Sequence, residues 1–146
     1  MAGDAELLEA LRRACQGEPR PERFTDSGHC CECAEHDAAL RAATPGTIGL
    51  ETLGNPGWDP ICFIAPEGFR YYLPGLARLA LGRGGAYYLD QFLFHLTCPG
   101  RIDALTAAQR AAVLALLEHI AAVMRLEVEA YDDLVRLDAA ILALVA

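Results

Sequence analysis

The residues with the greatest capacity for chemistry lie in one short segment, His29-Cys30-Cys31-Glu32-Cys33-Ala34-Glu35-His36. Thiolate sulfur and imidazole nitrogen are ligands that zinc prefers in proteins. On a helix that turns by about 100° per residue, His29, Cys33 and His36 share one stripe. Cys30 lies beside this stripe, one turn before Cys33. The segment therefore predicts a metal site, with zinc as the cofactor, whose first-choice ligands are His29, Cys30, Cys33 and His36.

Two other interpretations of the same segment remain open. Cys33 could lie on a buried helix face with Leu40, because free cysteine is a common small core residue; the histidines would then border the core. Alternatively, Cys30-x-x-Cys33 at a helix N-terminus is the arrangement of thiol redox proteins, in which the helix dipole lowers the pKa of the first thiol. A second ligand pair with the same spacing, His95-x-x-Cys98, could complete a tetrahedral set with Cys30 and Cys33.

The composition restricts the class of partner. The chain has 146 residues, of which 12 are basic and 20 acidic, so its net charge is -8. An acidic surface repels phosphate backbones, and we therefore expect no nucleic-acid partner. Metal ions, small cations or a basic protein partner are favoured instead. The apolar share of 53% argues against disorder.

The sequence predicts a cytoplasmic protein with no membrane association. Residues 1–6 contain neither a basic region nor a continuous apolar run, so they are not expected to form a signal peptide. No apolar stretch approaches the roughly 18 residues of a membrane span. In a reducing cytosol the six cysteines would be thiols or metal ligands.

The apolar periodicity predicts an all-α, or nearly all-α, fold in a single domain over residues 1–146. The expected helices cover 5–15, a segment from Thr25 or Asp26 to about 43, 66–81, 86–97, and 106–146. The last segment begins with a capping box, Thr106 to Gln109. It is too long for one helix in a compact domain, so we predict a break near 125–129 and a C-terminal helical hairpin.

The connection before Pro66 is rich in Gly and Pro from Pro45 onward. Within it, Ile61–Ile64 is expected to be a very short strand or part of the core wall. Trp58 is expected to anchor the connection in the core. Pro74 is expected to kink or break the following helix near Leu73, because proline lacks the N–H that continues the ladder.

Four groups of residues, in this order, resemble a family of uncharacterised bacterial proteins of unknown function. They cover roughly residues 25–120, and Cys31 departs from the family pattern. The resemblance implies no particular activity. The resembling groups are His29-Cys30-x-Glu32-Cys33-x-Glu35-His36, Leu53-Gly54-Asn55-Pro56-Gly57-Trp58-Asp59-Pro60, Pro66-Glu67-Gly68-Phe69-Arg70-Tyr71-Tyr72-Leu73-Pro74 and Leu105-Thr106-x-x-Gln109-Arg110.

Two functional hypotheses of different class follow. The first is a cytosolic metal-binding protein. The second is a non-catalytic regulatory protein whose acidic surface docks a basic partner, with the Cys/His segment in its core. In either case the segment Tyr131–Val145 carries more apolar residues than one helix face needs, which predicts a homodimer.

Overall fold

The computed structural model describes residues 2–54 and 59–146, and within these ranges the chain forms helices and no strand. This confirms the all-α prediction. The elements in chain order are α1 (Asp4–Ala14), α2 (Cys31–Arg41), α3 (Leu50–Leu53), η2 (Pro60–Phe63, a 3-10 helix), α4 (Pro66–Ala80), α5 (Leu89–Leu96), α6 (Ala107–Val123), α7 (Arg125–Ala130) and α8 (Leu134–Val145).

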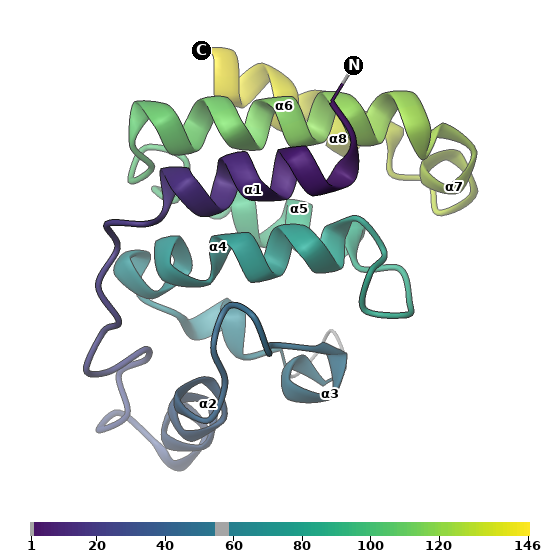
Figure 1. The fold of residues 1–146 in the computed structure, drawn as a ribbon. Helices are drawn as coiled ribbons and strands as arrows, with labels where there is room; N and C mark the ends of the chain where they lie inside the picture. Colours follow the sequence, from purple (N-terminus) through teal and green to yellow (C-terminus); the bar gives the residue numbers. More distant parts are fainter. Residues whose placement is uncertain (1, 55–58) are drawn as a thin grey trace.

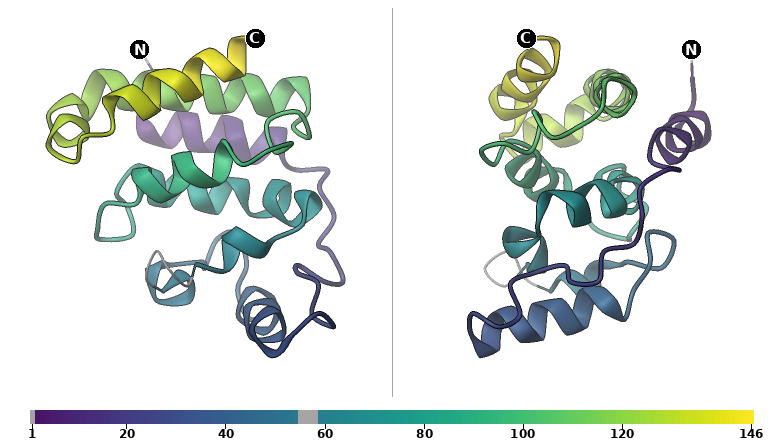
Figure 2. Two further views of the ribbon diagram at one scale, coloured as in Figure 1. Left: turned by 180° about the vertical axis from the view of Figure 1, so that it is seen from behind. Right: turned by 90° about the vertical axis from the view of Figure 1, so that its left-hand side faces the viewer.

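The longer helices form a bundle, and α2 lies outside it at one end of the molecule. Helix α1 packs against both α6 and α4, while α8 packs against α6 and α5 (Figure 1). Helices α2, α3 and η2 lie together on the other side of α4, and α2 packs against η2. Both termini are at the end of the bundle opposite to α2 (Figure 2).

The C-terminal third forms the predicted hairpin. Thr106 and Gln109 make the capping box in both directions at the start of α6. The expected break is present, because α6 ends at Val123 and the short α7 follows before the chain reverses. Asp132, with φ 58°, makes the turn into α8. Helix α8 then returns along α6, as seen from behind in Figure 2.

Helix α4 begins at Pro66 as predicted; of the two outcomes expected near Leu73, a kink or a break, the break is wrong. The helix runs without interruption to Ala80, with Pro74 inside it. Proline removes one hydrogen bond of the ladder. Burial compensates for this loss, because Tyr72, Leu73 and Leu76 are fully buried on either side of Pro74.

The Gly/Pro-rich connection is more regular than expected. The predicted strand near Ile61 is instead the 3-10 helix η2, whose first turn is capped by Asp59 Oδ1 accepting from the Ile61 N–H at 2.9 Å. Ile61 and Ile64 enter the core, whereas Cys62 and Phe63 are exposed. The prediction for Trp58 falls outside the described residues.

Two residues of α4 hold the segment that follows α2. The buried Tyr72 hydroxyl lies within hydrogen-bonding reach of the carbonyl oxygens of Leu40 and Ala43. Gly75 lets the chain at Pro45 approach α4 closely, since a Cβ at this position would lie 2.5 Å from the Pro45 oxygen. These contacts fix the C-terminal end of α2 relative to the bundle.

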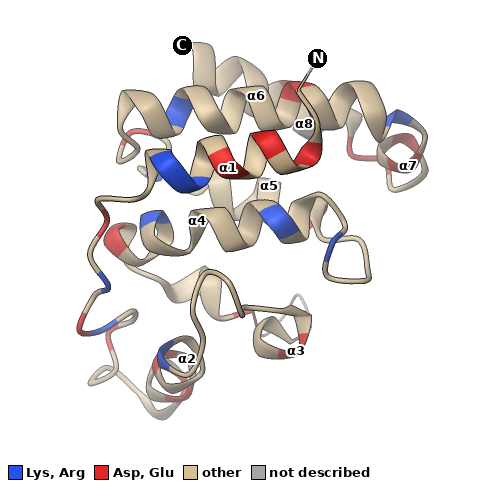
Figure 3. Ribbon diagram, in the orientation of Figure 1, with Lys and Arg blue, Asp and Glu red and all other residues tan. Residues whose placement is uncertain are grey.

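Charge is distributed along elements rather than gathered into one patch. In α1 the acidic Asp4 and Glu6 occupy the first turn, and Arg12 and Arg13 the last (Figure 3). This order complements the helix dipole. Among the described helices, none has the length and apolar character needed to cross a membrane.

Candidate metal centre

The Cys/His segment straddles the start of α2 instead of lying within a helix. The predicted start at Thr25 or Asp26 is wrong, because α2 runs only from Cys31 to Arg41. Its N-cap is Cys30, whose Sγ accepts a hydrogen bond from the Cys33 N–H at 3.4 Å. A thiol thus takes the place that a serine or aspartate oxygen usually occupies at a helix N-terminus.

Thr25 does not cap the helix because tertiary contacts use it. Its hydroxyl donates to the Cys33 carbonyl at 2.7 Å. Asp37, which is buried on α2, accepts from the backbone N–H groups of Phe24 and Thr25 at 2.7 and 3.2 Å. These bonds tie the chain before the helix to its buried face. A turn from Asp26 then closes with the His29 N–H donating to the Asp26 carbonyl at 3.0 Å, and it places His29 beside the first turn.

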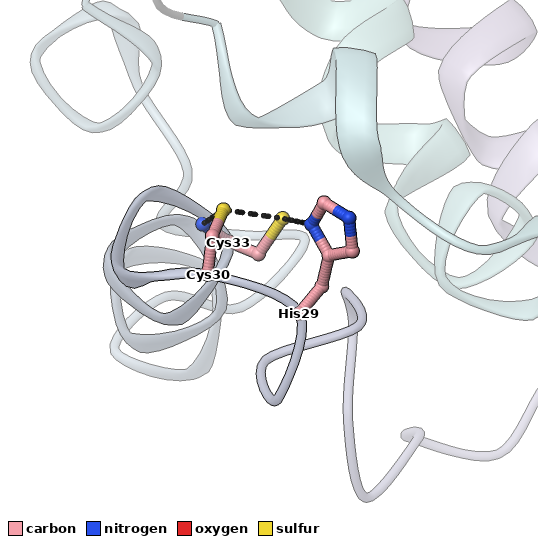
Figure 4. A group of neighbouring side chains, drawn as sticks. All are labelled: His29, Cys30 and Cys33. Atoms are coloured by element: carbon pink, nitrogen blue, oxygen red, sulfur yellow. Dashed lines mark hydrogen bonds between the residues drawn. The ribbon is translucent and has the colours of Figure 1, made fainter.

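Three potential ligand atoms converge at this point (Figure 4). The Sγ atoms of Cys30 and Cys33 are 3.4 Å apart, and Cys33 Sγ is 3.7 Å from His29 Nδ1. All three atoms lie within 4.8 Å of one another. Cys33 Sγ stands between the other two, and it is the most buried, since Cys33 is 9% exposed whereas His29 and Cys30 are open to solvent.

Two of the three separations are close to the edges of a tetrahedron around zinc. With Zn–S of about 2.3 Å and Zn–N of about 2.0–2.1 Å, tetrahedral angles place two sulfurs about 3.8 Å apart and a sulfur and a nitrogen about 3.6 Å apart. The observed values of 3.4 and 3.7 Å differ from these by a few tenths of an ångström. The third pair, Cys30 Sγ and the His29 nitrogen, lies within 4.8 Å, so side-chain rotation would have to complete the ligand set.

The three groups also perturb one another electrostatically. The backbone N–H of Cys33, followed by the side chains of His29 and Cys33, lowers the pKa of the Cys30 thiol to about 7. The hydrogen bond to Cys30 raises the pKa of His29. The same partner, together with burial, raises the pKa of Cys33. Cys30 is therefore the group most readily deprotonated for metal binding.

His36, the fourth residue predicted as a ligand, is not part of the converging group. It is 1% exposed, and its ring stacks on Phe63 with centroids 4.8 Å apart. Its Nε2 lies 3.6 Å from Glu32 Oε1. His36 and Cys33 share the buried face of α2, but His36 is one turn farther along, where it contacts η2. Cys31 is exposed and also lies outside the group.

His95 and Cys98 do not join Cys30 and Cys33. His95 is buried, and its Nε2 lies 2.9 Å from Asp59 Oδ2, which also accepts from the Tyr88 hydroxyl at 2.9 Å. Burial and then Asp59 raise the pKa of Tyr88. The buried Arg101 donates to the carbonyls of His95 and Ile61 at 3.0 and 2.7 Å. This polar network joins η2 to α5, and the sequence analysis assigned no such role to Asp59 or Tyr88.

The geometry separates the three interpretations of the segment. Cys33 is buried with Leu40 on α2, as the core interpretation expected, and His36 is buried too, whereas His29, which that interpretation placed at the border of the core, is exposed. Two thiols and an imidazole that meet at an exposed point could hold a metal ion. The same thiol pair lies close enough to form a disulfide after a small movement.

No protein-family model, curated protein or solved structure matches this chain. The family resemblance therefore stays a prediction, and the case for a function depends on the geometry of the site.

Proposed function

We propose that this protein binds one zinc ion through His29 Nδ1, Cys30 Sγ and Cys33 Sγ. The observation that supports the proposal is the convergence of these atoms within 4.8 Å, with the Cys30–Cys33 and Cys33–His29 separations near those of a zinc tetrahedron. Hydrogen bonds that the side chains of Thr25 and Asp37 make with the backbone fix the turn that precedes the site. The start of α2 carries both cysteines.

The chemistry of the donors selects the kind of metal. Two thiolates and one imidazole favour zinc or another thiophilic ion, while calcium and magnesium require oxygen ligands. The lowered pKa of Cys30 favours metal uptake near neutral pH, because a thiol must lose its proton before it binds. His29, whose pKa the Cys30 contact raises, must likewise lose a proton on binding.

Three protein ligands leave a fourth tetrahedral position open. Structural zinc sites are normally closed by four protein ligands, whereas an open position accepts water, a substrate or a ligand from another molecule. His29 and Cys30 are exposed, so this position faces solvent. We therefore propose a metal site that can exchange its fourth ligand. The position of α2 outside the bundle is consistent with such exchange.

The test is the metal content of tag-free, reduced protein after equilibration with zinc and removal of free metal. We expect about one zinc ion per chain in the native protein and none in Cys33→Ser, because Cys33 is the central ligand. Cys31→Ser is the matched control: it removes an adjacent, exposed thiol outside the group.

Cobalt provides a spectroscopic check on the same samples. Bound Co²⁺ should show the intense visible absorption of a four-coordinate ion together with thiolate charge-transfer bands, and both should vanish in Cys33→Ser. Native protein without stoichiometric metal, or equal loss of metal in Cys31→Ser and Cys33→Ser, would contradict the proposal.

A further inference from the structure

The cysteine pair at the start of α2 has the geometry of a reversible dithiol. Its sulfur atoms are 3.4 Å apart, and a disulfide requires about 2.05 Å, so they must approach by about 1.4 Å. Cys30 lies at the N-cap and Cys33 in the first turn, so rotation of two side chains can bring the sulfurs together while α2 stays in place.

The two cysteines differ in a way that assigns each a role. Cys30 is exposed, and its Sγ accepts a hydrogen bond from the Cys33 N–H, which stabilises the thiolate form. Cys33 is 9% exposed and its Sγ lies between Cys30 Sγ and the His29 ring, so the exposed Cys30 is the more accessible thiol for a molecule arriving from solvent. An accessible thiolate with a second, less exposed thiol next to it is the arrangement that thiol–disulfide exchange requires.

We propose that the metal-free protein exchanges with low-molecular-weight disulfides through Cys30 and Cys33. The Cys30 thiolate attacks one sulfur of RSSR, forms a mixed disulfide and releases RS⁻. Cys33, after losing its proton to solvent, attacks Cys30 Sγ and releases the second RS⁻. The dithiol is oxidised by two electrons, and RSSR is reduced to two RSH once both thiolates take up protons.

The exchange has a consequence for the metal, and this part rests on the function proposed above. Disulfide formation removes two of the three ligands, leaving His29 alone, and a single imidazole does not retain zinc. Oxidation would therefore release the ion, and reduction would restore the site. The exchange itself does not depend on the protein binding metal.

The experiment treats the full-length, reduced, chelator-treated protein with glutathione disulfide and follows intact mass and peptide maps after acid quenching. We expect a Cys30–Cys33 disulfide in the native protein and in Cys31→Ser. In Cys33→Ser, which cannot resolve the mixed disulfide, we expect a stable glutathione adduct on Cys30. In Cys30→Ser we expect no adduct on Cys33. A Cys30–Cys31 disulfide, or adducts forming equally fast on Cys30 and on the exposed Cys62, would overturn the proposal.

A second arm repeats the oxidation on zinc-loaded protein with a chromogenic chelator present. Released zinc should appear in step with the Cys30–Cys33 disulfide and return to the protein on reduction. Protein that binds zinc but never forms the disulfide overturns this inference alone. Protein that forms the disulfide but binds no zinc overturns the proposed metal function and leaves the exchange standing.

Discussion

Among the single residues, Cys30 combines structural and chemical roles. Its sulfur caps α2 by accepting from the Cys33 N–H, and it is also one of the three converging ligand atoms. The same hydrogen bond is the largest cause of its lowered pKa. Of the four cysteines whose pKa values are shifted, Cys30 is the one whose pKa is lowered. The start of the helix therefore makes it the most reactive of these four thiols.

This difference predicts an order of alkylation in metal-free protein. The pKa of Cys30 is lowered to about 7, so its thiolate fraction near neutral pH is larger than that of an ordinary thiol. Partial desolvation by the surrounding protein raises the pKa of the solvent-accessible Cys62, and burial raises the pKa of Cys15 to about 12. Iodoacetamide, followed by peptide mapping over time, should modify Cys30 first, Cys62 later and Cys15 only after unfolding. The rate at Cys30 should rise with pH through its pKa of about 7 and level off only about one to two pH units above that value. Equal rates at Cys30 and Cys62 would contradict this assignment.

Substitution of the two histidines of the segment should affect metal affinity differently. His29 supplies a converging nitrogen, whereas His36 is buried against Phe63. His29→Gln should weaken zinc binding by more than about 100-fold, since even loss of an indirect partner costs about 10–100-fold. His36→Gln should retain zinc as long as the chain remains folded. Competition titrations against a chelator of known affinity measure the zinc affinities of the two variants, and circular dichroism verifies that each variant is folded. Greater loss in His36→Gln would instead support the four-ligand set expected from helical spacing.

Elements whose boundaries depend on local signals could be predicted from the sequence. Pro66 starts α4 because proline suits the first turn of a helix, and Thr106 with Gln109 starts α6 by mutual capping. The break after Val123 followed from the length of the apolar segment. For the site, the convergence of Cys30 and Cys33 was predictable from their spacing around one helical turn.

Elements whose boundaries depend on tertiary contacts could not be predicted. Thr25 has the right residue type for a cap, but its hydroxyl donates to Cys33 in the folded chain. His29 therefore reaches the site from a turn rather than from a helix stripe. His36 fits the helical spacing of a ligand, yet the packing of α2 on η2 directs it toward Phe63. The roles of Asp37 and Asp59 depend on partners distant in sequence.

The close approach of α4 to the chain after α2 predicts a measurable cost. In Gly75→Ala the new Cβ would lie 2.5 Å from the Pro45 oxygen and 2.6 Å from Ile48 Cγ2. We expect the free energy of unfolding to fall by about 1–3 kcal/mol, the range for overpacking a core, despite the helix preference of alanine. Gly17→Ala is the control, because its Cβ would meet nothing within 4 Å and should change stability by less than about 0.5 kcal/mol. Urea denaturation compares the two, and equal stabilities would contradict the close packing.

At the scale of the whole molecule, the candidate metal centre and the exposed apolar face of α8 lie in separate regions of the structure. The centre lies at the start of α2, on the side of α4 away from the termini, whereas α8 lies along the bundle (Figure 2). Val135, Leu142 and Val145 of α8 are 83, 67 and 60% exposed. An association through α8 would therefore leave the metal centre open. The basic protein partner expected from the net charge stays a prediction.

The exposed α8 residues are the basis of the predicted homodimer. Leu142 and Val145 are one turn apart and open to solvent, so a second copy of the same face could cover both. Light scattering at high concentration should give twice the 15.7 kDa mass of the chain. Leu142→Glu should return the mass to that of one chain while circular dichroism stays unchanged. A clean monomer of the native protein at high concentration removes this prediction.

The central claim, that His29, Cys30 and Cys33 bind one metal ion, is tested most directly by X-ray absorption at the zinc edge of loaded, reduced protein. We predict two sulfur ligands at about 2.3 Å and one imidazole nitrogen at about 2.0–2.1 Å, with a fourth, light-atom ligand. Cys31→Ser should give the same spectrum. A shell of four sulfurs, or a shell of nitrogen and oxygen without sulfur, would contradict the account.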